Sequence, residues 1–177
     1  ELKQLELWCV QYFQQLIKKG IENVILEASS HGLQQNRLDD LKFNTSIFTN
    51  FSRDHLDYHK SYKNYLNAKL ILFRKLTKKG GLVISDKSIN ETTILKKISR
   101  KNKLKTIFLG KNADLEILDI DKFKDLQLIK FKFKNKVYTF TTKLIGKTQI
   151  INLLMAVLAA SKSVSYTHLT LPTTLVV

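Results

Sequence analysis

The sequence predicts an α/β fold, in which a mostly parallel sheet is flanked by helices and a small antiparallel hairpin follows. Up to Gly110, short apolar segments rich in β-branched residues alternate with longer segments whose apolar residues recur at helical spacing. After Gly110, apolar and charged residues alternate, as Phe131 and Phe133 do with Lys130 and Lys132, which is typical of a strand with one solvated face. Alternating strands and helices imply right-handed crossovers, with helices on both faces of the sheet.

The first half of the chain is expected to form two amphipathic helices, two strands and a short polar helix or turn. Leu5, Trp8, Tyr12 and Phe13 are among the apolar residues that recur on one face of the first segment, so we expect an amphipathic helix that packs on the sheet. Hydroxyl side chains favour the N-cap position. The expected elements are a helix at 5–20, a strand at 23–27, a short polar helix or turn at 34–40, a strand at 45–49, and a helix at 62–76 with Ser61 as its N-cap.

The second half is expected to continue the alternation and then to form the hairpin. Lys79 followed by Gly80 and Gly81 is typical of a basic last helical turn with a glycine C-cap, so the helix expected at 62–76 should end before the strand at 81–85. The final apolar segment is shorter than the roughly 20 residues that span a bilayer, so we expect a buried helix. The expected elements are strands at 81–85, 104–109 and 115–120, a helix at 89–100, hairpin strands at 128–133 and 137–144, and a helix at 149–160.

Length and composition indicate one globular unit. A chain of 177 residues that is 44% hydrophobic and 25% charged can bury one core. The single cysteine, Cys9, excludes an intramolecular disulfide and is expected to be buried in the first helix. The sequence shows neither a signal-peptide pattern nor an apolar run of about 18 residues, which favours a soluble cytosolic protein without membrane contact.

The net charge of +15 raises the alternative of a basic nucleic-acid-binding module. The basic residues are nearly all lysines, and in 122–136 they alternate with apolar residues as on the solvated faces of strands. Clustered arginines and exposed aromatic residues would be expected of a nucleic-acid interface, and we therefore expect no nucleic-acid partner.

Polar and charged residues follow the first two predicted strands, at the point where each strand ends. Ligands of open α/β sheets bind past the carboxyl ends of the strands, so these side chains are expected to gather on one rim. The residues in question are Glu27, Ser29, Ser30 and His31 after the first strand, and Asp54, His55 and Asp57 after the second.

Three segments in this region, EASSHGLQQNR, FTNFSRDHLDYH and YLNAKLILF, resemble the Mur ligases, the ATP-dependent ligases that build the peptide stem of bacterial peptidoglycan. Gly146 and Asn152-Leu153-Leu154 resemble a later segment of the same family. The resemblance covers residues 1–160, which it implies are part of the family's central, P-loop-type ATP-binding domain. Residues 161–177 depart from the family, and we expect them to be a foreign or disordered tail.

The resemblance implies a magnesium site. The family's ligands match Glu27, His55 and Lys69, and the matching lysine is carbamoylated and serves catalysis. From the residues alone, Glu27 could instead cap a helix or pair with a lysine, and Lys69 could be an ordinary solvated lysine. His55 and His59 are spaced as zinc ligands often are, but the chain offers no cysteine pair and no HExxH to complete such a site.

Substrate and nucleotide contacts are implied in the same way. Ser29, Gln35 and Arg37 match positions that bind the UDP-N-acetylmuramoyl-dipeptide, and Asn152 matches a position near the adenine of ATP. Thr148-Gln149 departs from the family's usual Phe-Asn beside it. His31 is expected to order the Ser-Ser-His turn, while the roles of Asp57 and His59 stay open.

The SSHGL-x-Q-x-R form resembles the branch of the family that adds a diamino acid, diaminopimelate or lysine, to UDP-N-acetylmuramoyl-L-alanyl-D-glutamate. The implied reaction transfers the ATP γ-phosphoryl group to the D-glutamyl carboxylate, and the incoming amine attacks the acyl phosphate, with Mg²⁺ as cofactor. The sequence contains neither G-x-x-x-x-G-K-[ST] nor an Asn-Pro-Arg motif, so we expect a monomeric fragment, truncated at both ends and inactive alone. The alternative within the superfamily is another ligase, such as folylpolyglutamate synthase or an enzyme of another Mur step.

Overall fold

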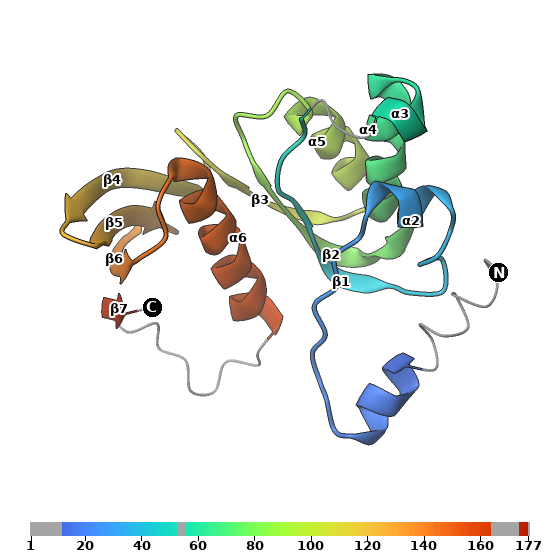
Figure 1. Ribbon diagram of the computed structural model, residues 1–177, viewed down its shortest axis with the longest axis horizontal. Helices are drawn as coiled ribbons and strands as arrows, with labels where there is room; N and C mark the ends of the chain where they lie inside the picture. Colours follow the sequence, from blue (N-terminus) through green and yellow to red (C-terminus); the bar gives the residue numbers. More distant parts are fainter. Residues whose placement is uncertain (1–11, 53–55, 164–173, 177) are drawn as a thin grey trace.

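The computed structural model describes residues 12–52, 56–163 and 174–176, and within them a single sheet runs in the order β1 to β7 (Figure 1). Its first four strands pair in parallel, β4, β5 and β6 pair antiparallel, and β7 pairs in parallel with β6. The predicted mostly parallel sheet with an antiparallel hairpin is thereby confirmed. The strands are β1 (Phe43–Phe48), β2 (Thr77–Asp86), β3 (Lys105–Leu109), β4 (Leu115–Phe123), β5 (Leu126–Phe133), β6 (Lys136–Thr142) and β7 (Thr174–Val176).

Helices cover both faces of the parallel strands, as the crossover rule requires (Figure 1). Helix α6 packs on β1 and β2 from one side, and α4 and α5 cover the other side. The helices are α2 (Ser30–Gln34), α3 (Leu56–His59), α4 (Tyr62–Ile71), the π-helical turn η1 (Leu72–Leu76), α5 (Thr92–Lys101) and α6 (Lys147–Ser163). Residues 12–18 are also helical. Among the described residues, no helix is both long and apolar enough to cross a membrane.

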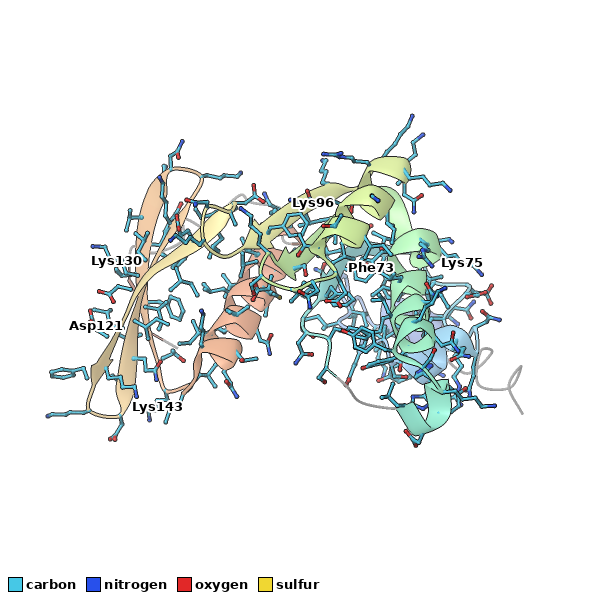
Figure 2. The ribbon with its side chains drawn as sticks, turned by 90° about the horizontal axis from the view of Figure 1, so that it is seen from above. Phe73, Lys75, Lys96, Asp121, Lys130 and Lys143 are labelled. Carbon is cyan, nitrogen blue, oxygen red and sulfur yellow. The ribbon has the colours of Figure 1, made fainter. Side chains whose placement is uncertain are left out.

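Strand β2 is buried on both faces and divides the interior into two cores. Leu82 and Ile84 belong to the core beneath α6, whereas Val83 belongs to the core beneath α4 and α5. This assignment follows from the two-residue side-chain period of a strand. Figure 2 shows Phe73 inside the second core and Lys75, two residues later, pointing to solvent.

The hairpin of β5 and β6 extends the first core beyond the parallel strands. Phe131 and Phe140 pack with Leu154 of α6, and the alternating lysines lie on the outer side, as the pattern predicts. Lys130, for example, projects away from α6 (Figure 2). Lys134 and Asn135 form the turn with φ values of 48° and 62°, the backbone of a type I′ turn, whose twist matches that of the strands.

The predicted strand at 23–27 is wrong. Residues 21–29 have no regular secondary structure, and the side chain of Ile25 is 97% exposed. The apolar residues of this segment favour a strand, but β-propensity is expressed only where a neighbouring strand supplies hydrogen bonds and a packing surface. In the described sheet, β1 is the edge strand, and it pairs only with β2.

The first helix also differs from the prediction. Its described part does not pack on the sheet, because Ile17 is 71% exposed and the segment lies apart from the strands (Figure 1). An apolar stripe becomes buried only where another element covers it, and the described residues provide no such cover. The residues before Tyr12, including Leu5, Trp8 and Cys9, lie outside the described residues.

The Ser61 cap is as predicted, since Ser61 Oγ accepts a hydrogen bond from Asn64 N at 3.1 Å.

The glycine pair Gly80-Gly81, which was expected to end a helix, instead forms a bulge in β2. The π-helical turn ends at Leu76, and β2 begins at the next residue. The pairing with β1 then shifts across residues 78–81, where Gly80 has a φ of 78°. A basic turn followed by glycine therefore does not distinguish a helix C-cap from a bulge.

The two cores generate a stability prediction. Replacement of Ile84 by alanine should lower the free energy of unfolding by about 2–5 kcal/mol, because Ile84 is fully buried between the sheet and α6. The matched control is Ile145→Ala, which removes the same atoms from a side chain that is 73% exposed and should cost less than about 0.5 kcal/mol. Urea unfolding curves measure both values. Equal losses in the two variants would contradict the assignment of the core.

Candidate functional site

The segment that follows the irregular residues 21–29 begins with a capped helical turn. Ser29 is the N-cap of α2, with extended backbone angles, and its Oγ accepts a hydrogen bond from Gly32 N at 3.1 Å. This cap turns the chain two residues after Glu27. The Ser29 hydroxyl stays exposed at the start of the helix, so one of its lone pairs serves the cap while its proton can be donated to a ligand.

Helix α2 is joined to α3 by polar and ring contacts. Ser30 Oγ and His59 Nε2 lie 2.9 Å apart, and both side chains are buried. Gln35 Nε2 donates a hydrogen bond to the hydroxyl oxygen of Tyr58 at 2.9 Å. The ring of His31 lies against that of Tyr58, with centroids 4.0 Å apart, so the expectation that His31 orders this turn agrees with its packing.

Helix α3 is joined in turn to α4. The ring of His59 stacks on Tyr65, with centroids 5.1 Å apart and an interplanar angle of 30°. Asn64 Nδ2 donates to the backbone oxygen of His59 at 3.2 Å. One helical turn further along, Lys69 Nζ lies 5.3 Å from the ring centre of Tyr65. Lys69 Nζ also lies 6.0 Å from the ring centre of Phe48, the last residue of β1, which places the amine at the carboxyl end of that strand.

The contacts between α2, α3 and α4 form one group, here called the motif cluster, which consists of Ser30, His31, Tyr58, His59, Tyr65 and Lys69. It brings together parts of three sequence motifs that are far apart in the chain. Sequence reasoning left His59 without a role and did not single out Tyr58 or Tyr65. The spacing of Tyr65 and Lys69, four residues apart in a predicted helix, was the signal that could have indicated their contact.

The predicted magnesium ligands Glu27, His55 and Lys69, and the aspartates near His55, are only partly described. Glu27 is exposed, in the irregular segment before α2, and Asp57 is exposed in the first turn of α3. Asp54 and His55 lie outside the described residues. Among the residues that are described, no three His, Cys, Asp or Glu side chains are grouped as a metal site. The exposed Glu27 carboxylate offers the oxygen donors that Mg²⁺ prefers, whereas Lys69 would become such a donor only as a carbamate.

Two of the predicted substrate-binding residues have buried polar atoms that are not satisfied by the described residues. Both residues lie in the segment just after α2, and the atoms Gln35 Oε1 and Arg37 Nε are buried without a hydrogen-bond partner among the described residues. Unsatisfied buried polar groups are rare in folded proteins, and a bound ligand is one way in which they become satisfied. The Arg37 Nε–H is a donor, so the group it lacks is an acceptor such as a carboxylate or phosphate oxygen.

The predicted nucleotide residue lies elsewhere. Asn152 is in α6, on the face of the sheet opposite α4, and is therefore separate from the motif cluster. Its Oδ1 is buried without a partner among the described residues. Gly146 precedes α6 with a φ of 103°, a backbone conformation that favours glycine because other residues rarely adopt it.

The sequence and the fold of this chain are similar to those of known proteins. A family model described as the Mur ligase middle domain matches residues 6–160. The chain is 45% identical over 144 residues to the UDP-N-acetylmuramoyl-L-alanyl-D-glutamate–2,6-diaminopimelate ligase of Rickettsia montanensis, covering 81% of this chain and 30% of the relative. It is 36% identical over 138 residues to the Aquifex aeolicus ligase of the same name, covering 78% of this chain and 28% of that protein. The chain thus spans about 30% of the length of these curated relatives.

Solved structures show the same fold. A structure of a ligase with that name superposes with a TM-score of 0.70 at 27% identity, covering 78% of this chain and 29% of the other. A folylpolyglutamate synthase complex with AMPPCP superposes with a TM-score of 0.60 at 12% identity, covering 72% of this chain and 31% of the other, a likeness of fold alone. The family match over most of the chain, the level of identity and the shared topology agree, and this chain belongs to the Mur ligase middle domain family.

Proposed function

We propose that this chain is part of an ATP-dependent amide-bond ligase that adds diaminopimelate to UDP-N-acetylmuramoyl-L-alanyl-D-glutamate in the cytoplasm, a step of peptidoglycan synthesis. The motif cluster is the observation that carries the proposal, because it joins the Ser29–Arg37 segment to the amine of Lys69 at the carboxyl end of β1. The names of the relatives, at up to 45% identity, support the choice of substrate. Lysine as the added diamino acid, and folylpolyglutamate synthesis, have less support, the latter resting on likeness of fold.

The residues around α2 are suited to hold an anionic, hydroxyl-rich substrate. Arg37 would bind a carboxylate or phosphate through its guanidinium group, whose Nε is buried and still available among the described residues. Gln35 and Ser29 would contribute an amide oxygen and a hydroxyl proton. Asn152, on the other face of the sheet, would accept a hydrogen bond from the adenine amino group of ATP through Oδ1.

Lys69 would act as a carbamate. The neutral amine attacks the carbon of CO₂ and loses one proton to solvent, and the product is an anion with two oxygen donors. The aromatic rings of Tyr65 and Phe48 favour the ammonium form by about 0.5–2 kcal/mol. An ammonium about 4 Å from a divalent cation would be disfavoured by roughly 8 kcal/mol at an effective dielectric constant near 20. The second effect is larger, so the carbamate, and not the ammonium, is the form of Lys69 that would suit a site holding a divalent cation.

Glu27, His55 and carbamoylated Lys69 are the residues that would hold magnesium, which when bound would neutralise charge between the phosphates and the substrate carboxylate. The stack of Tyr65 on His59 would fix the direction in which the Lys69 side chain projects from α4. The D-glutamyl carboxylate would be held near Arg37 while it accepts the γ-phosphoryl group, and the amine of diaminopimelate would then displace phosphate.

A chimeric enzyme tests the function. Residues 6–160 would replace the matching segment of the Rickettsia montanensis relative, and ATP-dependent formation of the UDP-linked tripeptide would be measured. Turnover should stay within about tenfold of the parent, a change of no more than about 1.4 kcal/mol in activation free energy. The 177-residue chain alone should show no turnover, because its sequence has no phosphate-binding G-x-x-x-x-G-K-[ST] loop. A chimera that unfolds cooperatively but forms no tripeptide would contradict the proposed function.

A substitution in the same chimera tests the carbamate. Lys69→Ala should lower turnover on the order of 100-fold or more, because it removes an anion from a site where charge is stabilised. Acetate or formate should restore part of the activity by occupying the vacated space, and bicarbonate should not. Lys63→Ala is the matched control, since Lys63 is exposed on the same helix. Near-normal turnover of Lys69→Ala would show that Lys69 is an ordinary surface lysine.

A further inference from the structure

We propose that His59 is a positioning residue, which fixes Lys69 relative to the Ser29–Arg37 segment by joining Ser30 of α2 to Tyr65 of α4. The inference rests on the proposed function only for the role of Lys69 in catalysis. The contacts themselves are the hydrogen bond between Ser30 and His59 and the stack of His59 on Tyr65.

The imidazole ring of His59 is buried in the interior of the protein. Only 2% of its surface is exposed, and its Nε2 is in hydrogen-bond contact with Ser30 Oγ, which is itself buried. Neighbouring side chains enclose the ring, so His59 would act through these neighbours. Loss of the ring would leave the Ser30 hydroxyl buried without this partner, which is costly in a folded protein.

The helix that contains His59 and the helix that carries Ser30 are too short to hold their own positions. Helix α3 has four residues and α2 has five, whereas isolated helices need about 12–15 residues to be even marginally stable in water. Their placement must therefore come from tertiary contacts. His59 supplies such contacts on two sides, and Asn64 holds its backbone oxygen.

The connection to Lys69 passes through Tyr65. Tyr65 is buried between the rings of His59 and Phe51, whose centroids lie 5.1 Å and 4.7 Å from its own. Lys69 Nζ lies over the Tyr65 ring. A side chain at position 59 that does not support Tyr65 would let this ring move and would expose the amine of Lys69, while the Ser30 end of α2 would lose its anchor.

The test measures the exposure of Lys69 in the 177-residue chain and needs no ligase activity. Each variant is treated with a trace of acetic anhydride, and mass spectrometry gives the acetylation of Lys69 relative to exposed Lys63. Ser30→Ala should raise this ratio severalfold, because the loss of one buried hydrogen bond makes local opening of the structure around Lys69 more frequent. Ser99→Ala is the control for the loss of a buried hydroxyl alone, because Ser99 is also buried but lies in α5 and its Oγ has no hydrogen-bond partner among the described residues. It should leave the ratio unchanged.

Two substitutions of His59 separate the ring from the hydrogen bond. His59→Phe keeps a ring against Tyr65 but loses the bond to Ser30, so its ratio should rise as in Ser30→Ala, and the double variant should rise no further. His59→Gln keeps a polar group that can form a hydrogen bond with Ser30, so its ratio should lie between that of His59→Phe and that of the unmodified chain. Both comparisons would show that Ser30 and His59 act through one contact.

An unchanged Lys69 ratio in Ser30→Ala, in a chain that still unfolds cooperatively, would overturn the positioning role. Ser30→Ala decides the question even if His59→Phe does not fold, because it removes a single oxygen atom. The outcome is independent of the proposed function, since a chimera without turnover would refute the ligase assignment and leave the labelling result standing. Conversely, an active chimera with unchanged labelling would refute the positioning role alone.

Discussion

Strand β2 is buried on both faces, and this burial positions the helices around the sheet. Ile84 and Val83 point to opposite sides of the sheet, and each needs an apolar cover. Helix α6 supplies one cover, and α4 and α5 supply the other. Because α4 lies across the strands to cover Val83, Lys69 in its last turn comes close to Phe48 at the carboxyl end of β1. The hydrophobic core thus determines where the amine is presented.

The site is held together differently from the core. Its elements are short and contribute few large apolar side chains, so buried polar contacts and stacked rings take the place of hydrophobic burial. The contact between Ser30 and His59 stabilises only while both partners are present, since a buried hydroxyl without a partner is unfavourable. Such contacts define a position more narrowly than apolar packing does, because a hydrogen bond tolerates little change in distance or angle.

The large positive charge of the chain has little part in this architecture. Most lysines lie on solvated faces, as Lys130 and Lys132 do on the hairpin, where salt screens their interactions. Lys69 differs because it is half-buried against two aromatic rings. A half-buried amine beside ring faces responds more strongly to a nearby charge than a solvated one does, which is why one lysine among many is a candidate for chemistry.

The α/β class, the hairpin around residues 134–136, the Ser61 cap and the family could be predicted from the residues, because these depend on local periodicity, turn chemistry and motif residues. The type I′ form of the turn is seen only in the structure. The structure was also needed to show that residues 23–27 do not form a strand and that the described part of the first helix does not pack on the sheet, because pairing and burial require a partner surface that composition does not reveal. It also decided the place of His59. A buried histidine and a solvated one have the same letter in the sequence, and the difference arises when Ser30 and Tyr65, distant along the chain, close around the ring.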